Sequence, residues 1–116
     1  MSFSFLSLAN TVKFNFAKME EFGSTLKSLR LKQGLFLRQV AAATEVDTSM
    51  ISKFEKGERF PTREQVEKLA LLFHLPEKQL LVHAFSDKLI ADLSNEPLAQ
   101  EILEQSIKKL KTKNKE

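Results

Sequence analysis

Apolar residues recur at intervals of three and four along most of this sequence, the spacing that lines one face of an α-helix. The pattern predicts helices over residues 21–33, 37–43, 48–56, 62–73, 76–93 and 98–110. The inner faces of the first four carry the predicted core: Phe22, Leu26, Leu29, Val40, Ala41, Ile51, Phe54, Val66, Leu69, Ala70 and Phe73. No long run of β-branched residues interrupts the centre, and glycine and proline number three each, so we expect an all-α fold.

Residues with special backbone roles mark the ends of these helices. Gly34 ends the first, and Thr62 and Gln65 have the spacing of a capping box at the start of the fourth. Pro76 suits the first turn of the fifth. Residues 95–97 (Asn-Glu-Pro) separate the last two helices, and we expect the lysine-rich end of the chain to be frayed.

The short helix over 48–56 separates its residue types with unusual clarity. Asp47 is placed to cap its start and Gly57 to end it. At 100° per residue, one arc of about 140° collects hydroxyl and lysine side chains, namely Thr48, Ser49, Ser52, Lys53 and Lys56. Met50, Ile51 and Phe54 lie opposite. This helix is therefore expected to bury one face and to present hydrogen-bonding side chains on the other.

The composition narrows the possible classes of protein. At 116 residues the chain suits one domain with a tail, and an apolar fraction of 42% allows a small core. The absence of cysteine excludes disulfides and thiolate metal sites. For the two histidines, His74 and His83, we expect structural roles, and we predict neither a metal nor a cofactor. No stretch approaches the roughly 18 apolar residues of a membrane-spanning helix, so no membrane partner is expected.

Positive charge is concentrated around the helix over 48–56. Between Leu26 and Arg63 stand 8 lysines and arginines against 4 acidic residues, whereas the segment after Pro76 carries 7 of each. The net charge of +3 is a weak signal by itself, but this local excess favours an anionic partner.

The first 18 residues differ from the rest of the chain. They include four phenylalanines but lack the basic start and small-residue cleavage site of a signal peptide. Their weak alternation is compatible with a β-hairpin turning at Asn10-Thr11, and a second explanation is that Met19 is the true start. We expect a loosely ordered leader over 1–18, a domain over 19–82 and a helical extension over 83–116.

The helices over 37–43 and 48–56 are joined by a three-residue turn, which is a helix-turn-helix pattern. The segments LKSLRLKQGL (26–35), VAAATEVDTSMISKFEKGERFPT (40–62) and VEKLALLFHL (66–75) resemble the lambda-repressor-like family of helix-turn-helix regulators, also called the xenobiotic-response-element family. The most specific part is ISKFEKG (51–57), followed by Arg59 and Pro61. The resemblance implies a five-helix DNA-binding domain, here followed by a C-terminal helical extension.

The resemblance also implies contacts with double-stranded DNA, because an exposed helix can enter the major groove and meet base edges. Thr48, Ser49 and Lys53 are the implied base contacts, with Thr48 suited to a thymine methyl and Lys53 to guanine O6 and N7. The implied phosphate contacts are Arg38, Ser52, Lys56 and Arg59. Phosphate contacts position such a protein, and base contacts choose the sequence.

Three positions depart from the family pattern. Phe36 stands where Ser or Thr commonly caps the helix over 37–43, and Leu37 replaces a glutamine that would hold a phosphate. Glu45 replaces a glycine in the turn, and a positive φ at this residue would cost about 1 kcal/mol. These departures put the phosphate contact of the helix over 37–43 in doubt and leave the helix over 48–56 intact.

Arg30 and Glu55 lie at the edges of the apolar faces of their helices. The resemblance implies a partly buried ion pair between them that holds the helix over 48–56 against the first helix. We therefore predict a structural role for this pair.

The last two predicted helices are too apolar for a solvated tail. Their candidate contact residues are Leu80, Leu81, Ala84, Phe85, Leu89, Ile90 and Leu93. They are expected either to cover the back of the domain or to pair with a second copy. A monomer would contact one half-site only, so we favour a homodimer through the last two helices.

Three functions remain open at this point. The first is a DNA-binding transcription regulator, most simply a cytoplasmic repressor of bacterial or phage origin, and the resemblance of DTSMISKFEKGERFPTREQVEKLA (47–70) hints at regulators beside restriction–modification genes. The second is the antitoxin of a toxin–antitoxin pair, whose tail holds a protein partner. The third is an interaction module that does not bind DNA. No catalytic residues are predicted, because the chain shows no nucleophile–base–orienter set and no glycine-rich phosphate loop.

Overall fold

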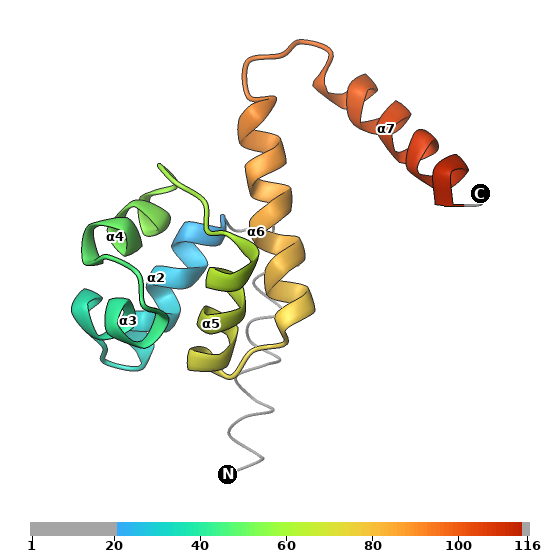
Figure 1. The fold of residues 1–116 in the computed structure, drawn as a ribbon. Coiled ribbons are helices and arrows are strands. Elements are labelled where there is room, and N and C mark those ends of the chain that lie inside the picture. Colours follow the sequence, from blue (N-terminus) through green and yellow to red (C-terminus); the bar gives the residue numbers. More distant parts are fainter. Residues whose placement is uncertain (1–20, 115–116) are drawn as a thin grey trace.

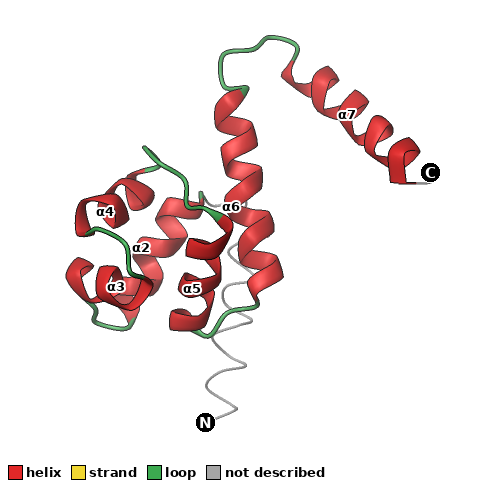
Figure 2. Ribbon diagram, viewed as in Figure 1, coloured by secondary structure: helices red, strands yellow, loops and turns green. Residues whose placement is uncertain are grey.

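The computed structural model describes residues 21–114, and within this range it consists of α-helices without a β-strand (Figures 1 and 2). The helices are α2 (Phe22–Lys32), α3 (Leu37–Thr44), α4 (Thr48–Lys56), α5 (Arg63–Phe73), α6 (Glu77–Asp92) and α7 (Ala99–Asn114). The predicted all-helical class is confirmed for this range, and α4 begins and ends where the sequence pattern places it. The predicted leader, its hairpin and the alternative start at Met19 lie outside the described residues.

Helices α2 to α6 enclose one apolar core. Helix α2 packs against α4 and α6, α3 packs against α4 and α5, and α5 packs against α6. All the core residues predicted for the first four helices are buried, and Leu75, Leu80, Leu81 and Ala84 complete the cluster. The prediction succeeds because a period near 3.6 residues sends one face of each short helix inward.

The turn between α3 and α4 is held in a left-handed conformation. Glu45 has φ 56° and ψ 41°, a conformation that the glycine common in the family would adopt without strain. The amide of the next residue, Val46, donates to the carbonyl of Ala41 at 3.0 Å, which closes the end of α3. Glu45 Oε1 lies 2.7 Å from Lys68 Nζ, and the lysine lowers the pKa of the carboxyl group. The side chain therefore contacts α5 at a position where glycine would relieve backbone strain.

Two contacts that the sequence analysis did not identify fix α2 in place. A Cβ atom added to Gly23 would lie 2.5 Å from the carbonyl oxygens of Phe54 and Glu55, so only glycine permits this crossing of α2 and α4. At the start of α2, the amide of Phe22 donates to Asp87 Oδ2 of α6 at 2.6 Å. Asp87 thus satisfies a free amide at a helix end, where Glu21 provides no side-chain cap.

Helix α6 buries one of its sides, but both its buried and its exposed side carry apolar residues. Leu80, Leu81 and Ala84 enter the core, whereas Phe85, Leu89 and Ile90 are exposed. Each alternative for these apolar residues thus applies to one face of α6. The buried residues cover the back of the domain, and the exposed residues stay open. The predicted boundary between residues 82 and 83 falls inside α6, and the chain leaves the helix only after Asp92.

Helix α7 projects from the far end of α6 and stands clear of the other helices (Figure 1). None of its residues is buried. The sequence pattern predicts an end near residue 110 and a frayed tail, but the helix continues to Asn114. Lysine has a good helix propensity, and Lys111 and Lys113 complement the negative end of the helix dipole.

Candidate nucleic-acid interface

Helix α4 is formed and oriented by its own sequence. The Asp47 carboxylate accepts a hydrogen bond from the amide of Ser49 at 3.1 Å, which caps the start of the helix. Gly57 ends it in the left-handed conformation at φ 75°. Ile51 and Phe54 are buried against the rest of the bundle. Because the apolar face is anchored in this way, the opposite face is directed toward solvent.

The exposed face of α4 carries the predicted base contacts. Thr48, Ser49 and Lys53 are exposed, and so is the predicted phosphate contact Lys56. Ser52 is half-buried. The structure therefore brings these five residues together on one short helix with no other described element above them.

Ser49 has a local partner that the sequence analysis did not foresee. Its hydroxyl donates to Asp47 Oδ2, which uses its one proton and leaves the oxygen able only to accept from another partner. The hydrogen bonds from Ser49 hold the pKa of Asp47 below its ordinary value of 3.8. Ser49 is therefore preorganised as an acceptor, suited to the amino group of cytosine or adenine rather than to a base acceptor.

The loop after α4 carries the next predicted phosphate contact. Arg59 is exposed, while Phe60 is half-buried and Pro61 is buried. The amides of Glu58 and Arg59 both point back to the carbonyl of Lys53, at 2.9 and 3.4 Å. The loop is thus tied to the end of α4, which keeps the exposed Arg59 close to that helix.

Arg38, another predicted phosphate contact, lies at the start of α3. Arg38 is exposed, and its Cζ atom lies 4.6 Å from the centre of the Phe36 ring. Gln39 replaces part of the missing cap, because its side-chain oxygen accepts a hydrogen bond from the amide of Phe36 at 2.7 Å. The Arg38 guanidinium group stacks on Phe36 near the positive end of α3. This end of the helix favours a phosphate.

Arg30 and Glu55 form the contact that the resemblance implied. Arg30 Nε lies 2.7 Å from Glu55 Oε2, and Nη2 lies 3.1 Å from Oε1, so the pair is bidentate. Arg30 Nη1 also donates to the carbonyl of Leu35 at 3.0 Å. The two side chains are only 11% and 6% exposed, and the hydrogen bond to Glu55 raises the pKa of Arg30. The pair joins α2 to the edge of the buried face of α4.

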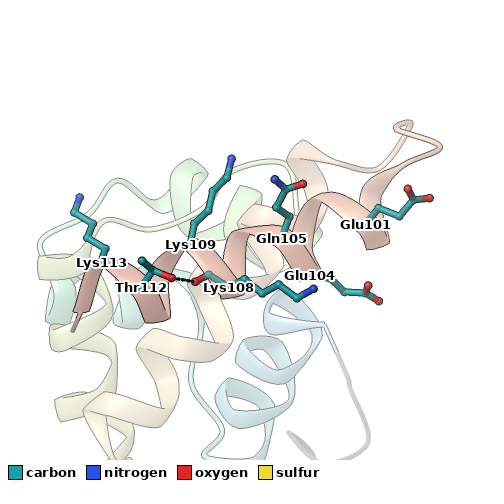
Figure 3. A pocket seen from close by; sticks show the side chains of 7 residues that line it. All are labelled: Glu101, Glu104, Gln105, Lys108, Lys109, Thr112 and Lys113. Carbon is teal, nitrogen blue, oxygen red and sulfur yellow. Dashed lines mark hydrogen bonds between the residues drawn. The ribbon is translucent and has the colours of Figure 1, made fainter. Parts of the chain in front are cut away.

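Three further features of the described residues concern metal sites, hollows and membrane spans. Between residues 21 and 114, no group of three or more histidine, cysteine or acidic side chains is arranged to hold a metal ion. A shallow hollow along α7 is lined by the polar side of that one helix, including Glu101, Glu104 and Lys108, and is open to solvent (Figure 3). Among the described helices, none is both long and apolar enough to cross a membrane.

Comparison with known proteins gives one family and one structural relative. Residues 21–81 match the family described as the helix-turn-helix domain. Among solved structures, the chain is similar to the clp gene regulator ClgR from Corynebacterium glutamicum, with 29% sequence identity, coverage of 73% of this chain and 88% of that chain, and a TM-score of 0.49. No curated protein matches the sequence.

Proposed function

Because this chain belongs to the helix-turn-helix domain family, we propose that it is a transcription regulator that inserts α4 into the major groove of double-stranded DNA. The observation that carries the proposal is the exposed row of Thr48, Ser49 and Lys53 on a helix whose other side is anchored in the core. Short side chains at the start of this row allow the helix to approach base edges closely.

The arrangement of α2 to α6 is consistent with the five-helix lambda-repressor-like domain that the resemblance implied. In this assignment α3 and α4 form the helix-turn-helix, and the Arg30–Glu55 pair fixes the angle at which α4 leaves the bundle. Loss of the pair would weaken DNA binding indirectly, because the position of α4 depends on it.

Each polar side chain has a separate role in this proposal. Thr48, Ser49 and Lys53 read bases, with Ser49 acting as an acceptor. The residues that contact the phosphates are Arg38, Ser52, Lys56 and Arg59. Arg38 stacks on Phe36 near the positive end of α3. In this position it contacts a phosphate in place of the glutamine that Leu37 replaces.

We propose that the regulator acts as a homodimer and represses transcription by occupying its operator. Two-fold partners read half-sites about 34 Å apart, so dimerisation doubles the contacts with a palindromic site. The exposed apolar residues of α6 and α7, including Phe85, Leu89 and Ile107, supply surface for such a contact. A place beside a restriction–modification locus is the narrower form of this proposal.

An antitoxin is the second candidate, and one observation favours it. Helix α7 has no buried residue and exposes Ile102, Ile107 and Leu110, as expected of a tail that is covered by another protein. A toxin encoded beside this gene and copurifying with the chain would support this candidate. A protein that shows no affinity for DNA would instead be an interaction module.

The test of DNA binding is a titration of a duplex from the chain's own promoter, followed by gel shift at several salt concentrations. We expect the affinity to fall steeply with salt, with a logarithmic slope of about −0.9 for each neutralised phosphate. Lys53→Ala should reduce binding, whereas Lys88→Ala, an exposed lysine on α6, should not. Equal losses from both variants, or no binding by the wild type, would contradict the proposal.

A further inference from the structure

The apolar side of α7 has no partner among the described residues. Ile102, Ile107 and Leu110 are 40%, 52% and 58% exposed, and the helix buries none of its residues. With Leu103, these side chains fall within an arc of about 140° at 100° per residue, which is a continuous stripe along the helix. Most of the stability of helices in proteins comes from packing of an amphipathic face, so a partner that covers this stripe would stabilise α7.

The charges of α7 are divided between its two ends. Glu101 and Glu104 stand in the first half, and four lysines, Lys108, Lys109, Lys111 and Lys113, stand in the second (Figure 3 shows most of them). This division complements the dipole of the helix itself, so it stabilises a single α7. It also makes two copies of α7 complementary when they run antiparallel, whereas a parallel pair would place lysines beside lysines.

We propose that α7 of one chain pairs with α7 of a second copy, antiparallel and centred on Ile107. This register places Ile107 beside its equivalent at the two-fold axis and brings Leu103 to within one residue's rise, about 1.5 Å, of the level of Leu110 of the second copy. Glu104 and Lys111 are seven residues apart and so lie on the same flank of the stripe. In the same register, Glu104 of each chain meets Lys111 of the other, so apolar and charged contacts agree on one arrangement.

This inference rests on the proposed homodimer and adds its contact surface and direction. Burial of the two stripes supplies the attraction, because exposed ion pairs contribute little by themselves. The two Glu104–Lys111 contacts select the antiparallel direction. The α2 to α6 bundle does not depend on α7 for its core, so substitutions in α7 leave the bundle folded.

The experiment measures the dimer without DNA, by analytical ultracentrifugation of the full chain. We expect the wild type to be a dimer and Ile107→Asp to be a monomer, because two carboxylates would meet on the axis. Glu104→Lys and Lys111→Glu should each weaken the dimer about 10-fold, since each replaces two attractive contacts by repulsive ones. Glu101 lies on the side of α7 away from the stripe, so Glu101→Lys should leave the dimer unchanged.

The decisive arm mixes the two charge variants. An equal mixture of Glu104→Lys and Lys111→Glu chains should recover the affinity that each loses alone. A wild-type monomer, an unchanged Ile107→Asp dimer, or a mixture no tighter than its components would overturn the proposal.

A duplex with a single half-site separates this proposal from the proposed function. Ile107→Asp should bind the single half-site like the wild type and lose only the additional affinity for a palindrome. If no variant binds DNA while the charge mixture still recovers the dimer, the regulator assignment fails and the pairing of α7 stands.

Discussion

Helix α4 buries Ile51 and Phe54 and exposes Thr48, Ser49 and Lys53, whereas α7 buries nothing and exposes an apolar stripe that includes Ile107. Both helices are amphipathic, and both carry lysines in their last turns. In α4 the polar face is exposed because the apolar face is satisfied. In α7 the apolar face is exposed because nothing in the described chain covers it. The first surface is therefore suited to a charged, hydrated partner and the second to another apolar surface.

The largest effect that separates the two helices concerns the core. Phe54→Ala should lower the free energy of unfolding by about 3–5 kcal/mol, because it removes a fully buried ring and leaves a cavity. Ile107→Ala should leave the unfolding of the bundle unchanged at concentrations where the chain is a monomer. Urea unfolding of both variants would measure the difference, and similar losses would mean that α7 belongs to the same core.

The next effect sharpens the account of how α4 is held. Glu55→Gln should lower the free energy of unfolding by about 3 kcal/mol, because Arg30 would keep its charge in a site that is nearly closed to water. Glu58→Gln, on an exposed neighbour in the following loop, is the matched control and should change little. An unchanged melting midpoint for Glu55→Gln would count against the structural role of the pair.

The sequence predicted local features well and distant ones poorly. The Asp47 cap and the capping box of Thr62 with Gln65 depend on neighbouring residues, and the structure confirms both. The Asp87 contact with the amide of Phe22 joins positions 65 residues apart, so no local pattern reveals it. Gly23 gave no signal either, since a glycine near a helix start is common and only the crossing with α4 makes it necessary.

The candidate site follows the same division. The exposure of Thr48 and Lys53 follows from helical periodicity, because Ile51 and Phe54 determine which side of α4 is buried. The orientation of the Ser49 hydroxyl toward Asp47 does not, since it depends on a rotamer choice beside the cap. Periodicity thus identifies which residues a partner can reach, and the hydrogen bonds then decide what each can donate or accept.

The smallest effect concerns the acid titration of the α4 cap. Hydrogen bonds from Ser49 lower the pKa of Asp47, so the folded state holds this carboxyl ionised at a pH where the unfolded chain protonates it. The cap therefore contributes its full stability above the ordinary value of 3.8 and loses it as the pH falls through the lower folded pKa. We expect the difference in melting temperature between the wild type and Asp47→Ala to shrink as the pH falls from about 6 to about 2. A difference that stays constant over this range would contradict the cap's role.

The most direct test of the account is selection of bound duplexes from a random pool, with the wild type, Thr48→Ala and Lys56→Ala in parallel. The wild type should enrich a palindrome whose half-sites lie about 34 Å apart. Thr48→Ala should relax the choice of base at one position of each half-site, and Lys56→Ala should enrich the wild-type sequence with lower affinity throughout. Failure of the wild type to enrich any sequence, or the same loss of discrimination from both variants, would contradict the claim that the exposed face of α4 reads DNA.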